Sequence, residues 1–201
     1  MIPYQKQKIE NAIAYLASEH KAKRGYYPYQ MWIYKALALL DFDILRKKGT
    51  PCLGLDYEAM EMGPVPTEFY FAVKNGNPPE GEKYRFVLLP NAKAQVENTS
   101  EPELDYFSDS EVEAMDDILD KFAVGEGDIN ALINQTHKSI LAWKTAWELA
   151  KKYNRGRMEM NYADEFDGLL GKDEKDLAPQ EERFICYMDM TRREKALLET
   201  V

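Results

Sequence analysis

The residues best suited to chemistry are four carboxylates that recur at helical spacing. Glu113, Asp116, Asp117 and Asp120 stand at positions i, i+3, i+4 and i+7, which places them on one face of a helix. Carboxylate oxygens in such an array could bind a divalent cation. However, the helix dipole favours acids near a helix start, and an acidic outer face tolerates solvent. A solvated face is therefore the favoured interpretation, with a metal-dependent enzyme as the weaker alternative.

Nucleophilic and phosphate-binding chemistry has little support in the sequence. Cys52 or Cys186 could pair with His137, but nothing in their spacing favours a catalytic pair, and cysteine is more often a small buried apolar residue. The Gly-x-Gly at residues 125–127 follows a helical segment rather than a strand, unlike a dinucleotide-binding loop. We therefore expect no catalytic residue, metal or cofactor, and we expect His137 to be hydrogen-bonded between helices.

An aromatic stretch beside basic residues is a candidate binding surface. Tyr26, Tyr27 and Tyr29 follow the basic residues of segment 21–24. Basic and aromatic side chains together can bind single-stranded nucleic acid, but a formal net charge of −9 argues against that partner. Packing at the start of a helix is the favoured interpretation, and a protein-binding surface is the alternative.

Charge is distributed unevenly along the chain. Residues 1–48 carry nine Lys and Arg against four acids, a net charge of +5. Residues 97–128 carry twelve acids and one lysine, a net charge of −11. Solvated helix faces are the simpler explanation. The alternative is an acidic surface that meets a basic partner.

The elements that position these residues are predicted to be mainly helices. Residues 31–48 are apolar almost all round, which predicts a central buried helix. Further helices are predicted at about 4–20, 56–62, 67–74, 108–122, 129–133 and 139–153. Residues 84–89 predict a strand, with 92–96 as its candidate partner. The expected fold class is mainly α (α+β), a compact helical domain around a buried central helix with a small β-hairpin insertion.

A firm break interrupts the predicted helices at Gly63, Pro64, Val65 and Pro66. A glycine can adopt the left-handed conformation that ends a helix, and Pro64 prevents its continuation. Pro66 restrains Val65 to an extended conformation. We therefore expect the break to fix the angle between two helices that pack on residues 31–48, which is a structural role.

Length and composition predict one main domain. The 201 residues are 45% hydrophobic, which is enough for a core. We expect that domain at residues 1–153, a polar connector at 154–178 and a C-terminal helix at 179–201. The two cysteines lack metal-site or disulfide spacing, and no apolar run is long enough to span a bilayer. A cytoplasmic protein without a membrane partner is therefore expected.

The order of these segments resembles the Panacea domain of SocA-like antitoxins, which also occurs in phage-associated proteins. The resemblance covers roughly residues 5–150. Its motifs are the apolar helix 34–49, the Gly-Pro-Val segment 55–70, and the acidic helix 107–122 followed by Thr-His and Trp in 132–143. Ala59-Met60 replaces the family's usual Ala-Trp, and Met62 replaces a common tyrosine. Both changes keep apolar bulk, so we expect the fold to be retained.

This resemblance implies binding rather than catalysis. Members of the family neutralise a co-encoded toxin by direct contact, and at least one delivers its toxin to a protease. We therefore expect a non-enzymatic antitoxin whose partner is a toxin protein encoded nearby. A proteolytic adaptor that binds a protease or unfoldase, or a phage-associated interaction protein without a toxin, is the alternative. The expected contact residues are Tyr26, Tyr27, Tyr29, Glu113, Asp117 and Asp120, and the expected structural motif is Gly63, Pro64, Val65, Pro66, His137 and Trp143.

Overall fold

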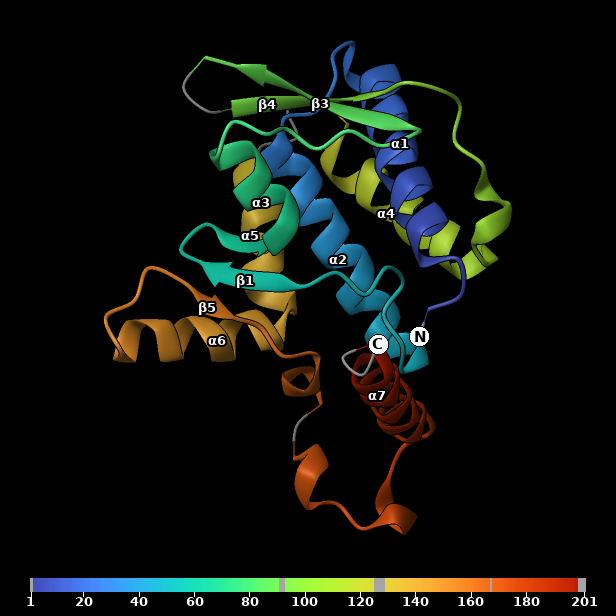
Figure 1. The fold of residues 1–201 in the computed structure, drawn as a ribbon, viewed down its shortest axis with the longest axis vertical. Coiled ribbons are helices and arrows are strands. Elements are labelled where there is room, and N and C mark those ends of the chain that lie inside the picture. Colours follow the sequence, from blue (N-terminus) through green and yellow to red (C-terminus); the bar gives the residue numbers. More distant parts are fainter. Residues whose placement is uncertain (1, 91–92, 125–128, 167, 199–201) are drawn as a thin grey trace.

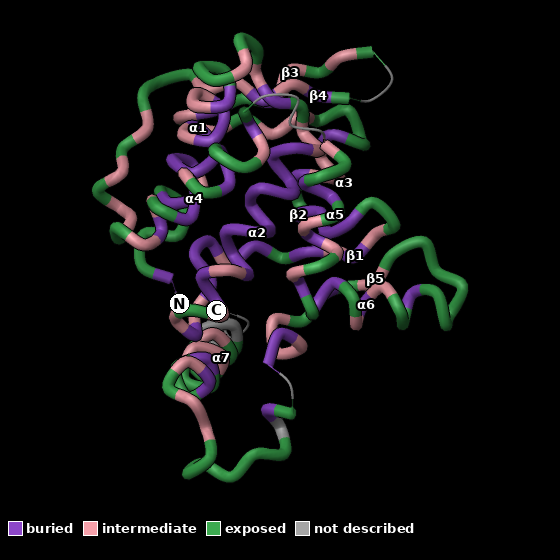
Figure 2. The backbone as a smooth tube through the Cα atoms, turned by 180° about the vertical axis from the view of Figure 1, so that it is seen from behind, coloured by how far each residue is buried: buried purple, intermediate pink, exposed green. Residues whose placement is uncertain are grey.

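Helix α2 (Gln30–Lys48) occupies the centre of the molecule, and most other elements are arranged around it (Figure 1). Its side chains are apolar on almost every face, so the helix is buried along most of its length (Figure 2). It ends at Gly49, whose left-handed backbone (φ +80°) lets the Gly49 N–H donate to the Leu45 carbonyl at 2.7 Å. The predicted central, buried helix is confirmed.

The computed structural model describes residues 2–90, 93–124, 129–166 and 168–198. The helices in these ranges, besides α2, are α1 (Gln5–Arg24), α3 (Thr67–Lys74), α4 (Asp109–Phe122), α5 (Ile129–Ser139), α6 (Leu141–Lys152) and α7 (Pro179–Leu198). The strands are β1 (Tyr57–Met60), β2 (Gly63–Pro66), β3 (Tyr84–Leu89), β4 (Lys93–Asn98) and β5 (Met158–Glu159). The mainly α fold with a small β-hairpin is therefore confirmed. None of the described helices combines the length and the apolar character that a membrane span requires.

Residues 57–66 form a β-hairpin, so the prediction of a helix at 56–62 is wrong. Strand β1 pairs antiparallel with β2, and Met60 lies opposite Gly63. Tyr57 and Ala59 are buried while Glu58 and Met60, which alternate with them, are half-buried, which is the two-residue period of a strand. Gly63 has the expected left-handed backbone (φ +92°), but it opens β2 instead of closing a helix. Residues 63–66 are therefore strand β2, and the expectation that they fix an angle between two helices is wrong, because strand β1 rather than a helix directly precedes them. Helix α3 follows as predicted.

Strands β3 and β4 form a second hairpin, in which Tyr84 lies opposite Asn98. The predicted strand at 84–89 is confirmed, and its partner extends a little beyond the expected 92–96. Phe86 and Val96 are buried on the same face of the hairpin, which packs on α1 and α2. Tyr29 forms a β-bridge with Gln95, so the loop that leads into α2 runs along β4.

Residues 154–178 pack against the helical domain, although their composition suggests a polar connector. Strand β5 pairs with β1, and the buried Glu165 forms an ion pair with Arg46 of α2. The other Glu165 oxygen accepts a hydrogen bond from the Ala142 N–H at 2.9 Å, at the start of α6. Helix α7 then contacts α2, and its buried Phe184 lies against the ring of Phe166. The domain boundaries at 153 and 178 stay predictions.

A buried carboxylate on α2 joins several of these segments. Asp41 accepts hydrogen bonds from the Leu53 N–H at 2.5 Å, from the Tyr57 hydroxyl at 2.9 Å and from the Tyr162 hydroxyl at 3.2 Å. A buried charge costs free energy unless it is hydrogen-bonded, and these donors supply that compensation. Asp41 therefore ties the loop before β1, strand β1 and the segment after β5 to the central helix.

Candidate functional site

The β1–β2 turn lies against α2 and α5, and only glycine fits at its corner. A Cβ atom added to Gly63 would lie 2.8 Å from Thr136 Oγ1 and 3.2 Å from Lys35 Cε. Its φ of +92° is also a conformation that other residues rarely adopt. Gly63, Pro64, Val65 and Pro66 are all buried, and their structural role stays a prediction.

Lys35 lies fully buried beneath this turn and was missed by the sequence reasoning. Its Nζ donates to the Pro64 carbonyl at 2.7 Å. Burial lowers the pKa of Lys35 to about 7, because the interior disfavours the charged form. The sequence does contain a sign of this role, because Lys35 is the single lysine within the apolar run Met31–Leu40. A lysine buried in such a run needs a hydrogen-bond acceptor.

His137 and Trp143 complete the cluster from α5 and α6. Their rings stack in parallel with centroids 3.8 Å apart. The Trp143 Nε1–H donates to the Met60 carbonyl at 3.0 Å, so the indole also holds the end of β1. His137 Nε2 is buried and makes no hydrogen bond with a described residue, so stacking replaces the expected bond between helices. Burial, followed by the nearby charge of Lys35, lowers the pKa of His137.

These contacts bring the motif residues into one buried cluster. Four separate parts of the chain contribute to this cluster: the turn at Gly63, Lys35 of α2, Thr136 and His137 of α5, and Trp143 of α6. Their hydrogen bonds go to backbone carbonyls and their rings are packed together. The arrangement can fix the hairpin on the helices, which is a structural role.

The four carboxylates of α4 have different partners and do not converge. Asp116 accepts from the Tyr15 hydroxyl at 2.6 Å, and Asp120 pairs with Lys23 at 2.9 Å. Asp117 lies 3.4 Å from Lys121 on its own helix, and Glu113 is exposed. No cluster of three or more metal-ligating side chains occurs in the described parts of the chain. The metal hypothesis thus finds no support in the placement of these acids.

Helix α4 itself begins as the sequence predicts. Ser108 and Glu111 form a capping box, in which the Ser108 N–H donates to the Glu111 carboxylate at 2.8 Å. Glu111 also pairs with Lys8 of α1 at 2.7 Å, and both side chains are nearly buried. Met115 and Leu119 pack into the core on the same side, so the exposed acids of α4 must face outward.

The three candidate tyrosines lie in the loop between α1 and α2. Tyr26 and Tyr29 are 43% and 50% exposed, whereas Tyr27 packs against β4 and donates to the Asn98 side chain at 3.1 Å. The Lys21 ammonium lies 4.1 Å from the Tyr27 ring centre. Tyr26 and Tyr29 are therefore surface residues and Tyr27 packs against the fold, so the three tyrosines do not belong to the core alone.

Two contacts connect this loop to the end of the acidic helix. Lys23, at the end of α1, pairs with Asp120, and the Trp32 Nε1–H donates to the Phe122 carbonyl at 3.3 Å. These contacts place the end of α1, which precedes the loop, and the last turn of α4 on one surface of the molecule. Glu113 and Asp117 extend the same surface toward the start of α4.

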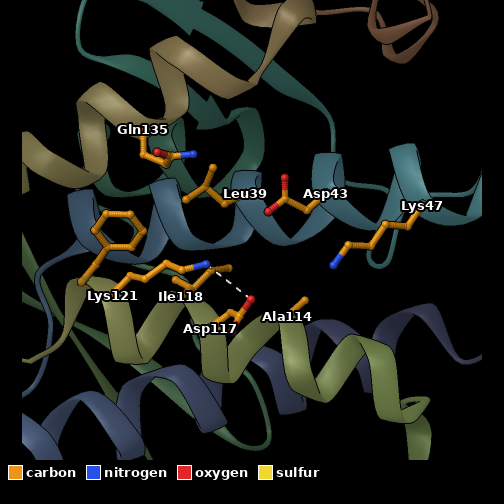
Figure 3. A pocket seen from close by; sticks show the side chains of 9 residues that line it. Leu39, Asp43, Lys47, Ala114, Asp117, Ile118, Lys121 and Gln135 are labelled. Carbon is orange, nitrogen blue, oxygen red and sulfur yellow. Dashed lines mark hydrogen bonds and ion pairs between the residues drawn. The ribbon is translucent and has the colours of Figure 1, made fainter.

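A small groove runs between α2 and α4 beside this surface (Figure 3). Its volume is about 160 Å³. Leu39 of α2 and Ile118 of α4 form apolar walls, and Gln135 of α5 closes one end. Asp117 and Lys121 border the groove, so one predicted contact residue lines it. Space of this size can accept one side chain of a binding partner.

The other residues considered for chemistry are not assembled into a site. Cys52 is completely buried, and burial raises the pKa of its thiol, which disfavours the reactive thiolate. Cys186 is exposed on α7. The Gly-x-Gly at 125–127 lies outside the described residues.

Comparison with protein families gives one match, to the description "Antitoxin SocA-like, Panacea domain", over residues 33–144. The match begins two residues before Lys35 and ends one residue after Trp143, so it spans the whole buried cluster. Searches of curated proteins and of solved structures found no match. Because the matched range covers more than half of the chain, the protein belongs to the SocA-like antitoxin family that carries the Panacea domain.

Proposed function

We propose that this chain is a non-enzymatic antitoxin that binds and masks a toxin protein encoded nearby. Family membership is the observation that carries the proposal. The cluster of Lys35, Gly63, His137 and Trp143 supports it, because it lies within the matched range and serves packing rather than catalysis. Two free cysteines are compatible with a reducing cytoplasm, where we place the complex.

We propose that the toxin binds where the α1–α2 loop meets α4. Tyr26 and Tyr29 offer exposed aromatic surface, which is enriched in protein interfaces. The outward carboxylates Glu113, Asp117 and Asp120 would complement a basic region of the toxin. The groove beside Asp117, which Asp43, Lys47 and Lys121 also line, provides a place that a single polar side chain of the toxin can enter.

Co-expression with the neighbouring reading frame tests this proposal. We expect that frame to arrest growth alone, and we expect this chain to restore growth and to co-purify with its product. A neighbouring product that is harmless alone, or that stays toxic beside this chain without forming a complex, would remove the main support.

A proteolytic adaptor is the second candidate, and helix α7 is the observation that favours it. The helix lies outside the matched range and exposes the apolar side chains of Ile185 and Met190. An adaptor needs such a second contact surface in addition to the one for its cargo. Recovery of a protease unfoldase, without a small toxin, in a pull-down with the full chain would favour this candidate.

A further inference from the structure

The turn that joins α6 to β5 concentrates exposed positive charge. Every residue from Lys151 to Arg157 is exposed, and four of these seven residues are Lys or Arg. None of the other three, Tyr153, Asn154 and Gly156, is acidic. In a chain with a formal net charge of −9, the segment 151–157, here called the basic turn, is a local region of opposite sign.

Three of the four cations are not neutralised within the described fold. Lys151, Lys152 and Arg155 form no ion pair with a described residue, whereas Arg157 lies 3.5 Å from the Glu58 carboxylate and 4.5 Å from the Phe71 ring centre. Cations at the end of a helix are favoured by the dipole, which accounts for Lys151 and Lys152. It does not account for Arg155, which follows the helix.

The backbone of the basic turn is fixed by its own hydrogen bonds. The Arg155 N–H donates to the Ala150 carbonyl at 2.8 Å, and the Asn154 N–H donates to the Lys151 carbonyl at 3.1 Å. Asn154 adopts the left-handed conformation (φ 53°), which asparagine tolerates better than most residues. Strand β5 then pairs with β1. A fixed backbone lowers the entropy that is lost on binding.

The basic turn also presents an aromatic side chain. Tyr153 is 59% exposed, and the Lys152 ammonium lies 5.8 Å from its ring centre. Tyrosine and arginine are the residue types that most often carry the binding energy of protein interfaces. Tyr153 and Arg155 therefore offer the basic turn an aromatic ring and a guanidinium group for specific contacts, in addition to its positive charge.

We propose that the basic turn, residues 151–157, is a binding surface for an acidic segment of a partner protein. Lys151, Lys152 and Arg155, which form no ion pair with a described residue, would complement carboxylates. The Tyr153 ring would cover the apolar part of the acidic side chains. A nucleic-acid backbone fits less well, because three cations neutralise few phosphates and the negative charge of the whole chain repels a long polyanion.

The position of the basic turn makes this surface independent of the proposed toxin contact. It projects beside α6 and β5, while α4 lies on the other side of α2 in both views (Figures 1 and 2). A protein bound to α4 therefore leaves the basic turn accessible. The inference stands whether or not a toxin binds α4.

Nuclear magnetic resonance titration of the full chain with a glutamate-rich peptide tests the inference. We expect the amide shifts to concentrate on residues 151–157. The combined variant Lys151→Glu, Lys152→Glu and Arg155→Glu should weaken binding by about tenfold or more. A matched control, Lys6→Glu with Lys93→Glu and Lys175→Glu, changes the same charge at exposed lysines elsewhere and should weaken binding less than about twofold.

Three outcomes would overturn the inference. The first is that no shift is seen, and the second is that both triple variants weaken binding equally. The third is that a single-stranded oligonucleotide binds the basic turn more tightly than the peptide, which would assign it to nucleic acid. Every substituted side chain is exposed, so the thermal unfolding temperature should fall only slightly in both triple variants, through the lost dipole interaction of Lys151 and Lys152 in one and the lost Lys6–Glu82 pair in the other. A small and similar fall separates loss of binding from loss of fold.

Discussion

The rings of His137 and Trp143 stack with their planes only 6° apart. Trp143 also donates to the Met60 carbonyl, so one side chain connects α5, α6 and the β1–β2 hairpin. We expect Trp143→Ala to lower the free energy of unfolding by about 3–5 kcal/mol, because a large buried ring is lost and a cavity remains. Chemical denaturation followed by circular dichroism measures this change.

Two variants serve as controls for the Trp143 prediction. Trp143→Phe keeps an aromatic ring for stacking but removes the N–H donor, so we expect a smaller loss, about 1–3 kcal/mol. Trp147 lies on the same helix and is only half-buried, so Trp147→Ala should cost less than Trp143→Ala. Equal losses at the two tryptophans would mean that the cluster is not specially important for stability.

The lowered pKa of Lys35 should make the free energy of unfolding depend on pH. Burial lowers its pKa to about 7 in the folded chain, whereas an unperturbed lysine titrates near 10.5. Between these values the unfolded chain holds a proton on Lys35 that the folded chain has released. The unfolded state therefore binds more protons, and stability should rise as pH increases from about 7 toward 10.5. Below pH 7 the cost of burying the ammonium is present in full.

The variant Lys35→Met isolates this contribution. Methionine has similar length but no titratable group, so the difference in unfolding free energy between wild type and variant should change across that pH range. Buried tyrosines such as Tyr34 and Tyr57, whose pKa values are raised by burial, act in the opposite direction at high pH and are present in both proteins. Parallel pH profiles for the two proteins would contradict the prediction.

Gly63→Ala tests the fit of the hairpin turn. The added methyl group would lie 2.8 Å from Thr136 Oγ1, and the left-handed backbone adds strain. Gly76 has a similar φ of +78° but no atom within 4 Å of an added Cβ, so Gly76→Ala reports the backbone strain alone. We expect Gly63→Ala to lower the thermal unfolding temperature more than Gly76→Ala, and to weaken toxin binding only as a consequence of lost stability.

Equal effects of the two glycine variants would show that the contacts with Thr136 and Lys35 relax without cost. A Gly63→Ala protein with full stability that no longer binds its partner would instead place the turn in the interface.

The sequence was sufficient for the long helices and for the β3–β4 hairpin, but not for the β1–β2 hairpin. The central helix was predictable because the run 31–48 is far longer than one turn and has no strand-like period. The β1–β2 hairpin was not predictable, since each strand has only four residues and Met60 and Met62 fit a helix equally well. Proline in a β-strand also argues against pairing, and here it is tolerated because β2 lies at the edge of its sheet.

The candidate site was predictable in its parts but not in its assembly. Periodicity shows which side of a helix is buried, but it does not show that Lys35 and His137 meet around Gly63. The carboxylates of α4 illustrate the same limit: spacing placed them together, yet Asp116 turns to Tyr15 and Asp120 to Lys23. Tertiary contacts, which spacing does not contain, decide these pairings.

Tyr29→Ala tests the proposed contact surface for the toxin. Its side chain is half exposed, so we expect an unchanged thermal unfolding temperature, together with a complex weakened by about 2 kcal/mol if the ring is a central contact. Titration calorimetry with the purified toxin measures the affinity. Tyr153→Ala removes an exposed tyrosine at the end of α6, outside the proposed contact surface, and should leave toxin affinity unchanged. Equal losses for both variants, or none for Tyr29→Ala, would move the contact away from the α1–α2 loop.

Removal of residues 154–201 tests whether the chain up to 153 is an independent domain. The removed part includes the Tyr162 hydroxyl, whose single proton is shared between the Leu55 carbonyl at 2.7 Å and Asp41 at 3.2 Å. It also includes Glu165, which pairs with Arg46. Without these groups Arg46 loses a buried partner and apolar surface of α2 becomes exposed to water, so we expect a marked fall in the thermal unfolding temperature.

The single variant Tyr162→Phe separates the hydrogen bonds from the burial of the segment, and it should cost about 1–3 kcal/mol because a buried Asp41 keeps fewer donors. A truncated chain as stable as the full protein would show that residues 1–153 fold on their own and that the later contacts add nothing to stability.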